Sequence, residues 1–192
     1  TRQDLLPADI GRELTRLQDE VPPFPTEQAL AEIEGSFGQP ASQLFASFEH
    51  EPLAAASIAQ VHGARLHSGD DVVVKILRPN VRELVRRDLE VMYALARLAE
   101  RWWPESRRLR PVDIVAEYEK TILNELDLVR EAANAAQLRR NWLGSPLIYV
   151  PQVYFDYCRK SVMVMERLHG IPIDDMEALQ AAGVNIPRLA AN

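Results

Sequence analysis

The sequence predicts an α+β domain in which helices flank an antiparallel sheet. Two observations lead to this prediction. The first fifty residues repeat apolar positions at helical spacing, whereas residues 53–66 and 72–77 have the apolar character of strands and lie on either side of a turn sequence at 68–70. Strand-like and helical stretches alternate up to residue 168, so we expect five strands, with helices inserted after the third.

The composition is that of an ordinary globular domain. Hydrophobic residues make up 47% and charged residues 26% of the 192 positions, which argues against disorder. A net charge of −6 argues against nucleic acid as a partner, because nucleic-acid binders neutralise phosphates. The single cysteine, Cys158, cannot form an internal disulfide, and no apolar stretch approaches the roughly 18 residues of a membrane-spanning helix. We therefore expect a soluble domain from a reducing compartment.

The N-terminal region, residues 1–50, is expected to be a helical extension. Its first helix carries an apolar stripe and ends at the proline-rich segment 21–25. Thr26 is expected to cap a second helix that stops at Gly38, and a short third piece surrounds Leu44 and Phe48. The stripe of the first helix consists of Ile10, Leu14, Leu17 and Val21.

Capping residues and helix breakers predict the later elements. Asn80 and Glu83 fit a capping box at the start of a helix that runs to Trp103. Pro111 starts another helix, which we expect to continue to Trp142. Strands are expected at 149–157 and 161–168, and a short helix capped by Asp174 closes at Gly183. The chain starts at Thr1 without an initiator methionine and stops as a helical pattern resumes, so we expect it to be part of a longer protein.

Lys75 is the first candidate for a functional residue. It lies in the middle of an apolar strand, on the same face as Val73 and Leu77. A lysine there either extends past its neighbours to water or holds a ligand. Nineteen of the 22 basic residues are arginine, so a lysine in this position indicates a need for a compact point charge, such as one that holds a phosphate.

An alanine-rich run precedes Lys75 by one hairpin. Loops that bind phosphates are usually rich in glycine there, because the missing Cβ lets backbone amides approach the anion, and alanine is the nearest substitute. An alanine run alone is more often tight packing. Its position before a strand lysine supports a role in phosphate binding.

Three segments in this order resemble the UbiB (AarF-type) family of atypical protein-kinase-like proteins. They read AAASIAQVH at 54–62, VVVKILRP at 72–79 and ELDLVREAANA at 125–135, and VMERLHG at 164–170 is similar to the family's hinge strand. The resemblance covers about residues 5–175. It implies a helical extension (1–50), a protein-kinase-like small lobe with a five-stranded antiparallel sheet and inserted helices (51–170), and a hinge with the start of a large lobe that is mostly absent (171–192).

The resemblance implies a binding site for ATP or ADP. Lys75 would hold the α- and β-phosphates, Met165 would be the gatekeeper, and the backbone of Glu166 and Leu168 would meet adenine. The loop that replaces the glycine-rich one, with the two positions that follow it on the next strand, comprises Ala54, Ala55, Ala56, Ser57, Gln60 and Val61.

The acidic partner of Lys75 is left open between two residues. Glu125 and Asp127 match the family's Glu-x-Asp motif, and Glu131 is the next acidic residue on the same expected helix. On that helix Glu125 flanks the apolar stripe, while Asp127 and Glu131 share the opposite face. Glu131 and Glu125 are equal candidates for pairing with Lys75, and Asp127 is better placed to hold the N-terminal extension.

Several parts of the family's machinery are missing from the sequence. The Lys-x-Gly-Gln motif belongs before Thr1, and the catalytic loop and the metal-binding aspartate belong beyond Asn192. The Mg²⁺ ligands are therefore expected beyond the C-terminus. The four histidines are scattered without ligand spacing, so we expect no metal site in this chain.

The resemblance implies an atypical kinase or ATPase that supports ubiquinone (coenzyme Q) biosynthesis or the handling of lipid-linked quinones. We expect a bacterial, cytoplasmic location, peripheral at the inner membrane. A basic, aromatic patch at residues 101–110 could contact anionic lipid, although a helix end packed by tryptophans explains it equally well. The alternatives are a nucleotide-sensing or scaffold module without catalysis, and a purely structural helical adaptor.

Overall fold

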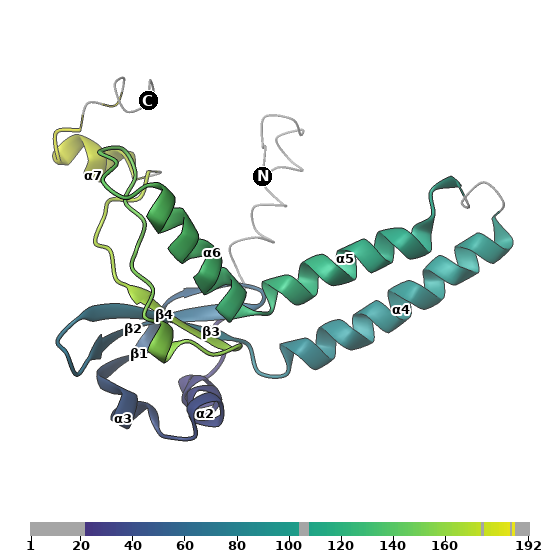
Figure 1. The fold of residues 1–192 in the computed structure, drawn as a ribbon, viewed down its shortest axis with the longest axis horizontal. Coiled ribbons are helices and arrows are strands. Elements are labelled where there is room, and N and C mark those ends of the chain that lie inside the picture. Colours follow the sequence, from purple (N-terminus) through teal and green to yellow (C-terminus); the bar gives the residue numbers. More distant parts are fainter. Residues whose placement is uncertain (1–21, 104–107, 174, 185, 187–192) are drawn as a thin grey trace.

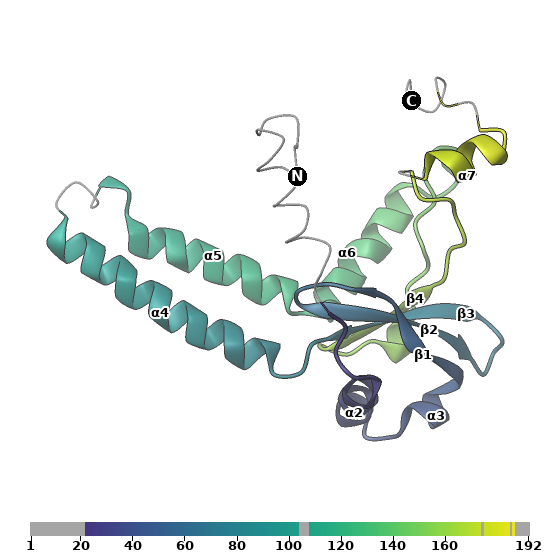
Figure 2. The same ribbon diagram turned by 180° about the vertical axis from the view of Figure 1, so that it is seen from behind.

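The computed structural model describes residues 22–103, 108–173, 175–184 and 186. A four-stranded antiparallel sheet lies at its centre, with helices on both faces and a long helical hairpin projecting to one side (Figures 1 and 2). This arrangement confirms the predicted α+β class. The first predicted helix, which ends at Val21, and the predicted cap Asp174 lie outside the described residues.

The sheet follows chain order. Strands β1 (Phe45–Ala55), β2 (Ala59–Leu66), β3 (Asp71–Leu77) and β4 (Val162–Glu166) are neighbours in the order β1-β2-β3-β4, and each pairs antiparallel with the next. The turn sequence between β2 and β3 forms the expected hairpin, with Gly69 in the left-handed region at φ 96°.

The strand predicted at residues 149–157 is wrong, whereas the one predicted at 161–168 is present as β4. Of residues 149–157, only Val153 forms a bridge to β4, opposite Met165, and the 3₁₀ turn η3 (Phe155–Tyr157) follows it. Pro151 has no N–H to donate, and the turn ends the extended backbone, so no continuous ladder can form. The segment still lies against β4, because Tyr154 N–H donates to the Val164 carbonyl at 3.0 Å.

One face of the sheet is covered by α2 (Thr26–Phe37) and α3 (Ala41–Leu44). Ile33 of α2 is fully buried against Val72, Val74 and Ile76 of β3 in the larger of the cores. The helical character expected up to residue 50 ends at Leu44, because β1 begins at Phe45. Gly38 ends α2 in the left-handed conformation as expected, but Pro25 rather than Thr26 occupies the N-cap position.

The opposite face carries α6 (Leu128–Asn141). The helix expected from Pro111 to Trp142 is in fact two helices, since α5 (Pro111–Glu125) ends before α6 begins. Leu126 and Leu128 are both fully buried in the core on this face. Residues two apart in a helix point about 200° away from each other, so burying both in one core requires a break between them. Asp127 occupies this break and accepts a hydrogen bond from Val129 N–H as the N-cap of α6.

Helix α4 (Val81–Trp102) pairs with α5 to form the projecting hairpin (Figures 1 and 2). The pair has a small core of its own around Leu89, Ala96 and Val115. The capping box predicted at Asn80 and Glu83 is absent, because Asn80 adopts a left-handed conformation and its side chain makes no cap hydrogen bond. None of the helices in the described residues is long and apolar enough to cross a membrane.

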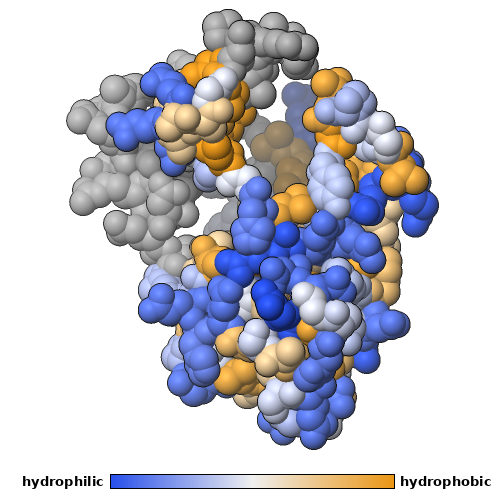
Figure 3. Space-filling view, turned by 90° about the vertical axis from the view of Figure 1, so that its left-hand side faces the viewer, coloured by the Kyte–Doolittle hydropathy of each residue, from blue (hydrophilic) through white to orange (hydrophobic). Residues whose placement is uncertain are grey.

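Helix α7 (Met176–Ala181) lies beyond the far end of α6. Asp175 caps this helix by accepting a hydrogen bond from Ala178 N–H. Figure 3 shows the side of the molecule that lies on the left in Figure 1. On this side, hydrophobic residues gather mainly on the upper part, while hydrophilic residues predominate across the middle. The segments around α6 and α7 carry exposed Leu143, Leu147 and Ile173.

Candidate functional site

A row of four residues crosses the sheet on the face that carries α6. The strand registers pair Ala54 with Val61, Val61 with Lys75, and Lys75 with Met163. Residues directly opposite each other in a sheet share a face, so the alanine run, Val61 and Lys75 lie on one surface. A neighbouring row on the same face pairs Val73 with Met165.

Lys75 forms an ion pair with Glu131. The Lys75 Nζ atom lies 2.6 Å from Oε1 and 2.8 Å from Oε2 of Glu131, which is in the first turn of α6. The two side chains are 24% and 39% exposed, so the pair lies at the edge of the core within reach of a ligand from solvent. Exposed or partly exposed pairs of this kind contribute only about 0–1 kcal/mol to folding, so stability alone does not account for it.

Neither Glu125, the other candidate partner, nor Asp127 forms an ion pair with Lys75. Glu125 is the exposed last residue of α5, and the Asp127 carboxylate caps α6. The break at Asp127 changes the direction of the chain, which invalidates the assignment of faces on a continuous helix. The Asp127 carboxylate makes no hydrogen bond or ion pair with residues 22–50, the part of the N-terminal extension that the structure describes.

The loop between β1 and β2 lies beside this row. Ala54, Ala56 and Ser57 are exposed, so the alanine run is not core packing. The loop has a defined shape, because Ala56 N–H donates to the Ala59 carbonyl at 2.8 Å and Arg78 Nε donates to the Ala56 carbonyl at 2.9 Å. A small, fixed loop of this kind leaves room for a ligand close to the backbone.

The end of β4 forms the segment predicted as the hinge. Met165 packs against the core on the Lys75 face, and Leu168 is exposed just beyond the strand. Glu166 N–H donates to the Gln152 carbonyl, and the Glu166 carboxylate accepts hydrogen bonds from Gln152 N–H and, at 2.7 Å, from the Tyr149 hydroxyl. Its side chain is therefore held to the segment at 149–152.

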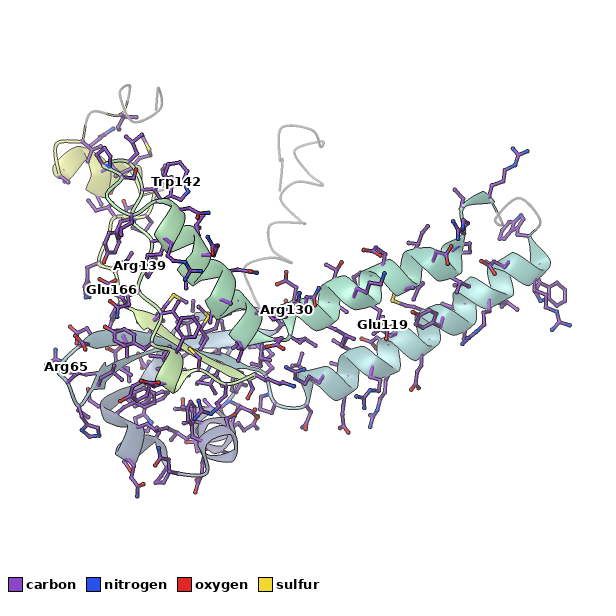
Figure 4. The ribbon with its side chains drawn as sticks, in the orientation of Figure 1. Arg65, Glu119, Arg130, Arg139, Trp142 and Glu166 are labelled. Atoms are coloured by element: carbon purple, nitrogen blue, oxygen red, sulfur yellow. The ribbon has the colours of Figure 1, made fainter. Side chains whose placement is uncertain are left out.

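Charge and hydrogen bonds also set the protonation of Glu166. The hydrogen bond from Gln152 N–H lowers its pKa below the usual range, and Tyr149 and the nearby Arg139 act in the same direction. Arg139 of α6 lies 4.0 Å from the carboxylate, and the two side chains point toward each other in Figure 4. An ionised Glu166 thus fixes the start of the hinge segment to α6.

Gln60 does not lie on the proposed nucleotide face. It is fully buried on the opposite face, where its side-chain oxygen accepts from Phe24 N–H and its amide contacts the Phe24 carbonyl. Its assignment as a cofactor-binding residue is therefore not supported by its position. Side chains on neighbouring strand positions point to opposite faces, and Val61 is the one that faces Lys75.

The sequence-based reasoning missed several residues near the site. Val73 shares the face with Lys75, and Arg78 contacts the loop. Glu49 of β1 pairs with Arg167 just beyond β4, and a Cβ atom on Gly63 would collide with both side chains. Strand alternation had already placed Val73 on the Lys75 face without assigning it to the site, whereas the Glu49–Arg167 pair joins residues too far apart in sequence to be predicted.

A lysine on β3 paired with a glutamate of α6, the helix that covers the same sheet face, beside a small-residue loop between β1 and β2, defines a small lobe of the protein-kinase type. Comparison with known proteins agrees with this class. The family model for the ABC1 atypical kinase-like domain matches residues 16–192, and the chain belongs to this family.

Curated relatives are called probable protein kinase UbiB. Those of Pseudomonas paraeruginosa and Marinobacter nauticus are 59% and 58% identical over 190 residues, which is 99% of this chain and 36% and 35% of the relatives. The chain therefore spans about a third of their length. A solved structure, the complex of Rv3197 with erythromycin from Mycobacterium tuberculosis, superposes with a TM-score of 0.69 at 30% identity, covering 90% of this chain and 43% of that one.

Proposed function

We propose that this chain is the part of a UbiB-type atypical kinase or ATPase that binds ATP or ADP. The observation that carries the proposal is the Lys75–Glu131 ion pair on the same sheet face as the exposed alanine loop. A lysine ammonium binds phosphate as a point charge, and a paired carboxylate holds that charge in place before the ligand arrives. Adenine would lie between Val61, Val73 and Met165, next to the backbone of Glu166 and Leu168.

The described residues fit the nucleotide better than they fit its metal. No cluster of three or more histidine, cysteine, aspartate or glutamate side chains in the described part of the chain could hold a metal ion. By the family resemblance, the carboxylates that hold Mg²⁺ in phosphoryl transfer belong to a later part of the whole protein. Phosphoryl transfer by the whole protein, and a role in ubiquinone biosynthesis or the handling of lipid-linked quinones at a membrane, remain proposals that rest on the names of the relatives.

Substitution of Lys75 tests the proposal in the full-length protein that contains this chain. Lys75→Ala should weaken the binding of ATP and of ADP by about tenfold or more, because a charge-assisted contact to phosphate is lost. The melting temperature should change little, since the Lys75–Glu131 pair is partly exposed. Lys75→Arg should also weaken binding, because a planar guanidinium does not replace a compact ammonium.

The matched control is Lys120→Ala, which removes an exposed lysine paired with Glu117 on α5. Isothermal titration with each nucleotide should give wild-type affinity for this control. Equal affinities in wild type and Lys75→Ala would reject the assignment of Lys75. Nucleotide binding without any turnover would favour the alternative of a non-catalytic sensing module.

A further inference from the structure

Arg78 is the residue that holds the backbone of the alanine loop. Its Nε donates to the Ala56 carbonyl at 2.9 Å, and its backbone N–H donates to the Ile58 carbonyl at 2.8 Å. It thus contacts the loop on both sides of Ser57. Arg78 belongs to the segment VVVKILRP at 72–79, which also contains Lys75. The proposed nucleotide site uses the lysine of this segment and gives the arginine no role.

The guanidinium of Arg78 is itself held in place by residues 22–24, on the side away from the loop. It lies 5.4 Å from the centre of the Phe24 ring, and a terminal nitrogen donates to the Pro22 carbonyl at 2.8 Å. The Phe24 backbone is bound in turn by the fully buried Gln60 side chain, at 3.0 Å from N–H to Oε1. A chain of contacts therefore runs from the core, through Phe24 and Arg78, to the loop.

The position of Arg78 determines which way a loop peptide points. Arg78 contacts Phe24, which belongs to the core on the face opposite Lys75. A trans peptide places its C=O and N–H on opposite sides. Because the Ala56 carbonyl is directed at Arg78, the Ser57 N–H of the same peptide points the other way, toward the side that carries Lys75. This N–H has no hydrogen-bond partner among the described residues.

We propose that Arg78 is a positioning residue that orients the Ser57 N–H toward the phosphates of the bound nucleotide. The inference rests on the proposed nucleotide site and adds a residue to it. Glycine-rich loops present their amides through flexibility, whereas this loop would present one amide in a fixed direction, set by an arginine on the other face of the sheet. The interaction concerns phosphate and not adenine, so its loss should affect the two parts of the ligand differently.

The test compares ADP with adenosine, which lacks phosphate, in the full-length protein. Arg78→Gln should lower the affinity for ADP by about tenfold while leaving that for adenosine nearly unchanged. The control is Arg65→Gln, which removes an exposed arginine paired with Asp71 at the far end of the same hairpin, a position labelled in Figure 4. That control should keep the wild-type ratio of the two affinities.

A merely structural role for Arg78 would weaken adenosine and ADP alike, or neither, and either result would overturn the inference. If Lys75→Ala weakens ADP binding but Arg78→Gln does not, the inference fails and the proposed function stands. A wild-type protein that binds no adenine nucleotide would overturn both. Should Arg78→Gln not fold, Arg78→Lys decides, because an ammonium cannot contact Pro22, Phe24 and Ala56 together. The ratio of ADP to adenosine affinity should then fall about threefold, and an unchanged ratio would reject the inference.

Discussion

At the scale of single residues, a buried hydrogen-bond network beneath the site needs a neutral histidine. His62 is fully buried, and its Nε2 lies 2.7 Å from the Gln60 amide nitrogen, while Nδ1 lies 2.9 Å from the Glu49 carbonyl. Since the Gln60 amide donates, Nε2 must accept and Nδ1 must carry the proton. Protonation of Nε2 would set two donors against each other in the core.

This arrangement predicts a dependence of stability on pH. Burial lowers the pKa of His62, and the neighbouring His50 acts in the same direction, while Glu49 opposes it. Between the folded pKa and the unfolded value of about 6.5, the unfolded chain binds more protons. The contribution of His62 is therefore present above about pH 6.5 and is lost as the pH falls toward the folded pKa, with a slope of at most about 1.4 kcal/mol per pH unit.

Urea unfolding at a series of pH values from 8 down to about 5 measures this contribution. His62→Gln keeps a side-chain acceptor for Gln60 and removes the titration, so its free energy of unfolding should fall less on acidification than that of the wild type. His67→Gln, at an exposed position, is the control and should follow the wild-type curve. An identical pH slope for wild type and His62→Gln would contradict the prediction.

At the scale of elements, the β1–β2 loop is stiffened by its alanine side chains as well as by Arg78. Ala56 is exposed and lies outside the strands, so its Cβ limits the backbone without filling a core. Each Cβ disfavours positive φ and keeps ligands farther from the backbone. A more flexible loop should change the contacts to the outermost phosphate more than those to the inner two.

Ala56→Gly should therefore change the preference between ATP and ADP. The free energy of unfolding should fall by only about 0.5–1 kcal/mol. Titration of both nucleotides beside a melting curve checks this, with Ala46→Gly at an exposed position near the start of β1 as the control. A large loss of stability with an unchanged preference between ATP and ADP would contradict this prediction and indicate that the alanine run serves packing.

The split between α5 and α6 shows how an element boundary determines a site. The helix expected from Pro111 is present up to Glu125, but its continuation to Trp142 as one helix was wrong. Leu126 and Leu128 both enter the core, and Leu128 N–H donates to the Lys160 carbonyl at 3.1 Å, so the chain leaves the helix there and starts again. The new helix then places Glu131, rather than Glu125, opposite Lys75.

At the scale of the whole molecule, the projecting α4–α5 hairpin carries an exposed apolar stripe. Leu95 is 60%, Leu98 53% and Trp102 73% exposed, at helical spacing on α4. The two tryptophans at this end, Trp102 and Trp103, are mostly exposed, so packing by tryptophans does not explain the patch. Apolar surface of this kind promotes association in solution.

Replacing Leu95, Leu98 and Trp102 together by glutamine should reduce self-association of the 192-residue chain without lowering its melting temperature appreciably, since these side chains contribute little to a core and glutamine favours helix. Light scattering and thermal melting by circular dichroism measure the two effects. The control Leu89→Gln, at a position only 4% exposed on the same helix, should destabilise the chain strongly. An equal loss of stability in the triple variant would show that the stripe is part of a core.

The sequence alone determined the fold class, the β2–β3 hairpin, the start of α5 at Pro111 and the end of α2 at Gly38, because each depends on local periodicity or on the backbone preferences of proline and glycine. It also indicated Lys75 and the alanine run as candidate site residues, because a single hairpin separates them in the sequence. Only the tertiary structure decided that Glu131 pairs with Lys75, that Gln60 faces the opposite core, that residues 149–157 form no strand and that Arg78 holds the loop. Periodicity gives the side on which a residue lies only within one unbroken element, and a break such as that at Asp127 resets the direction of every side chain that follows.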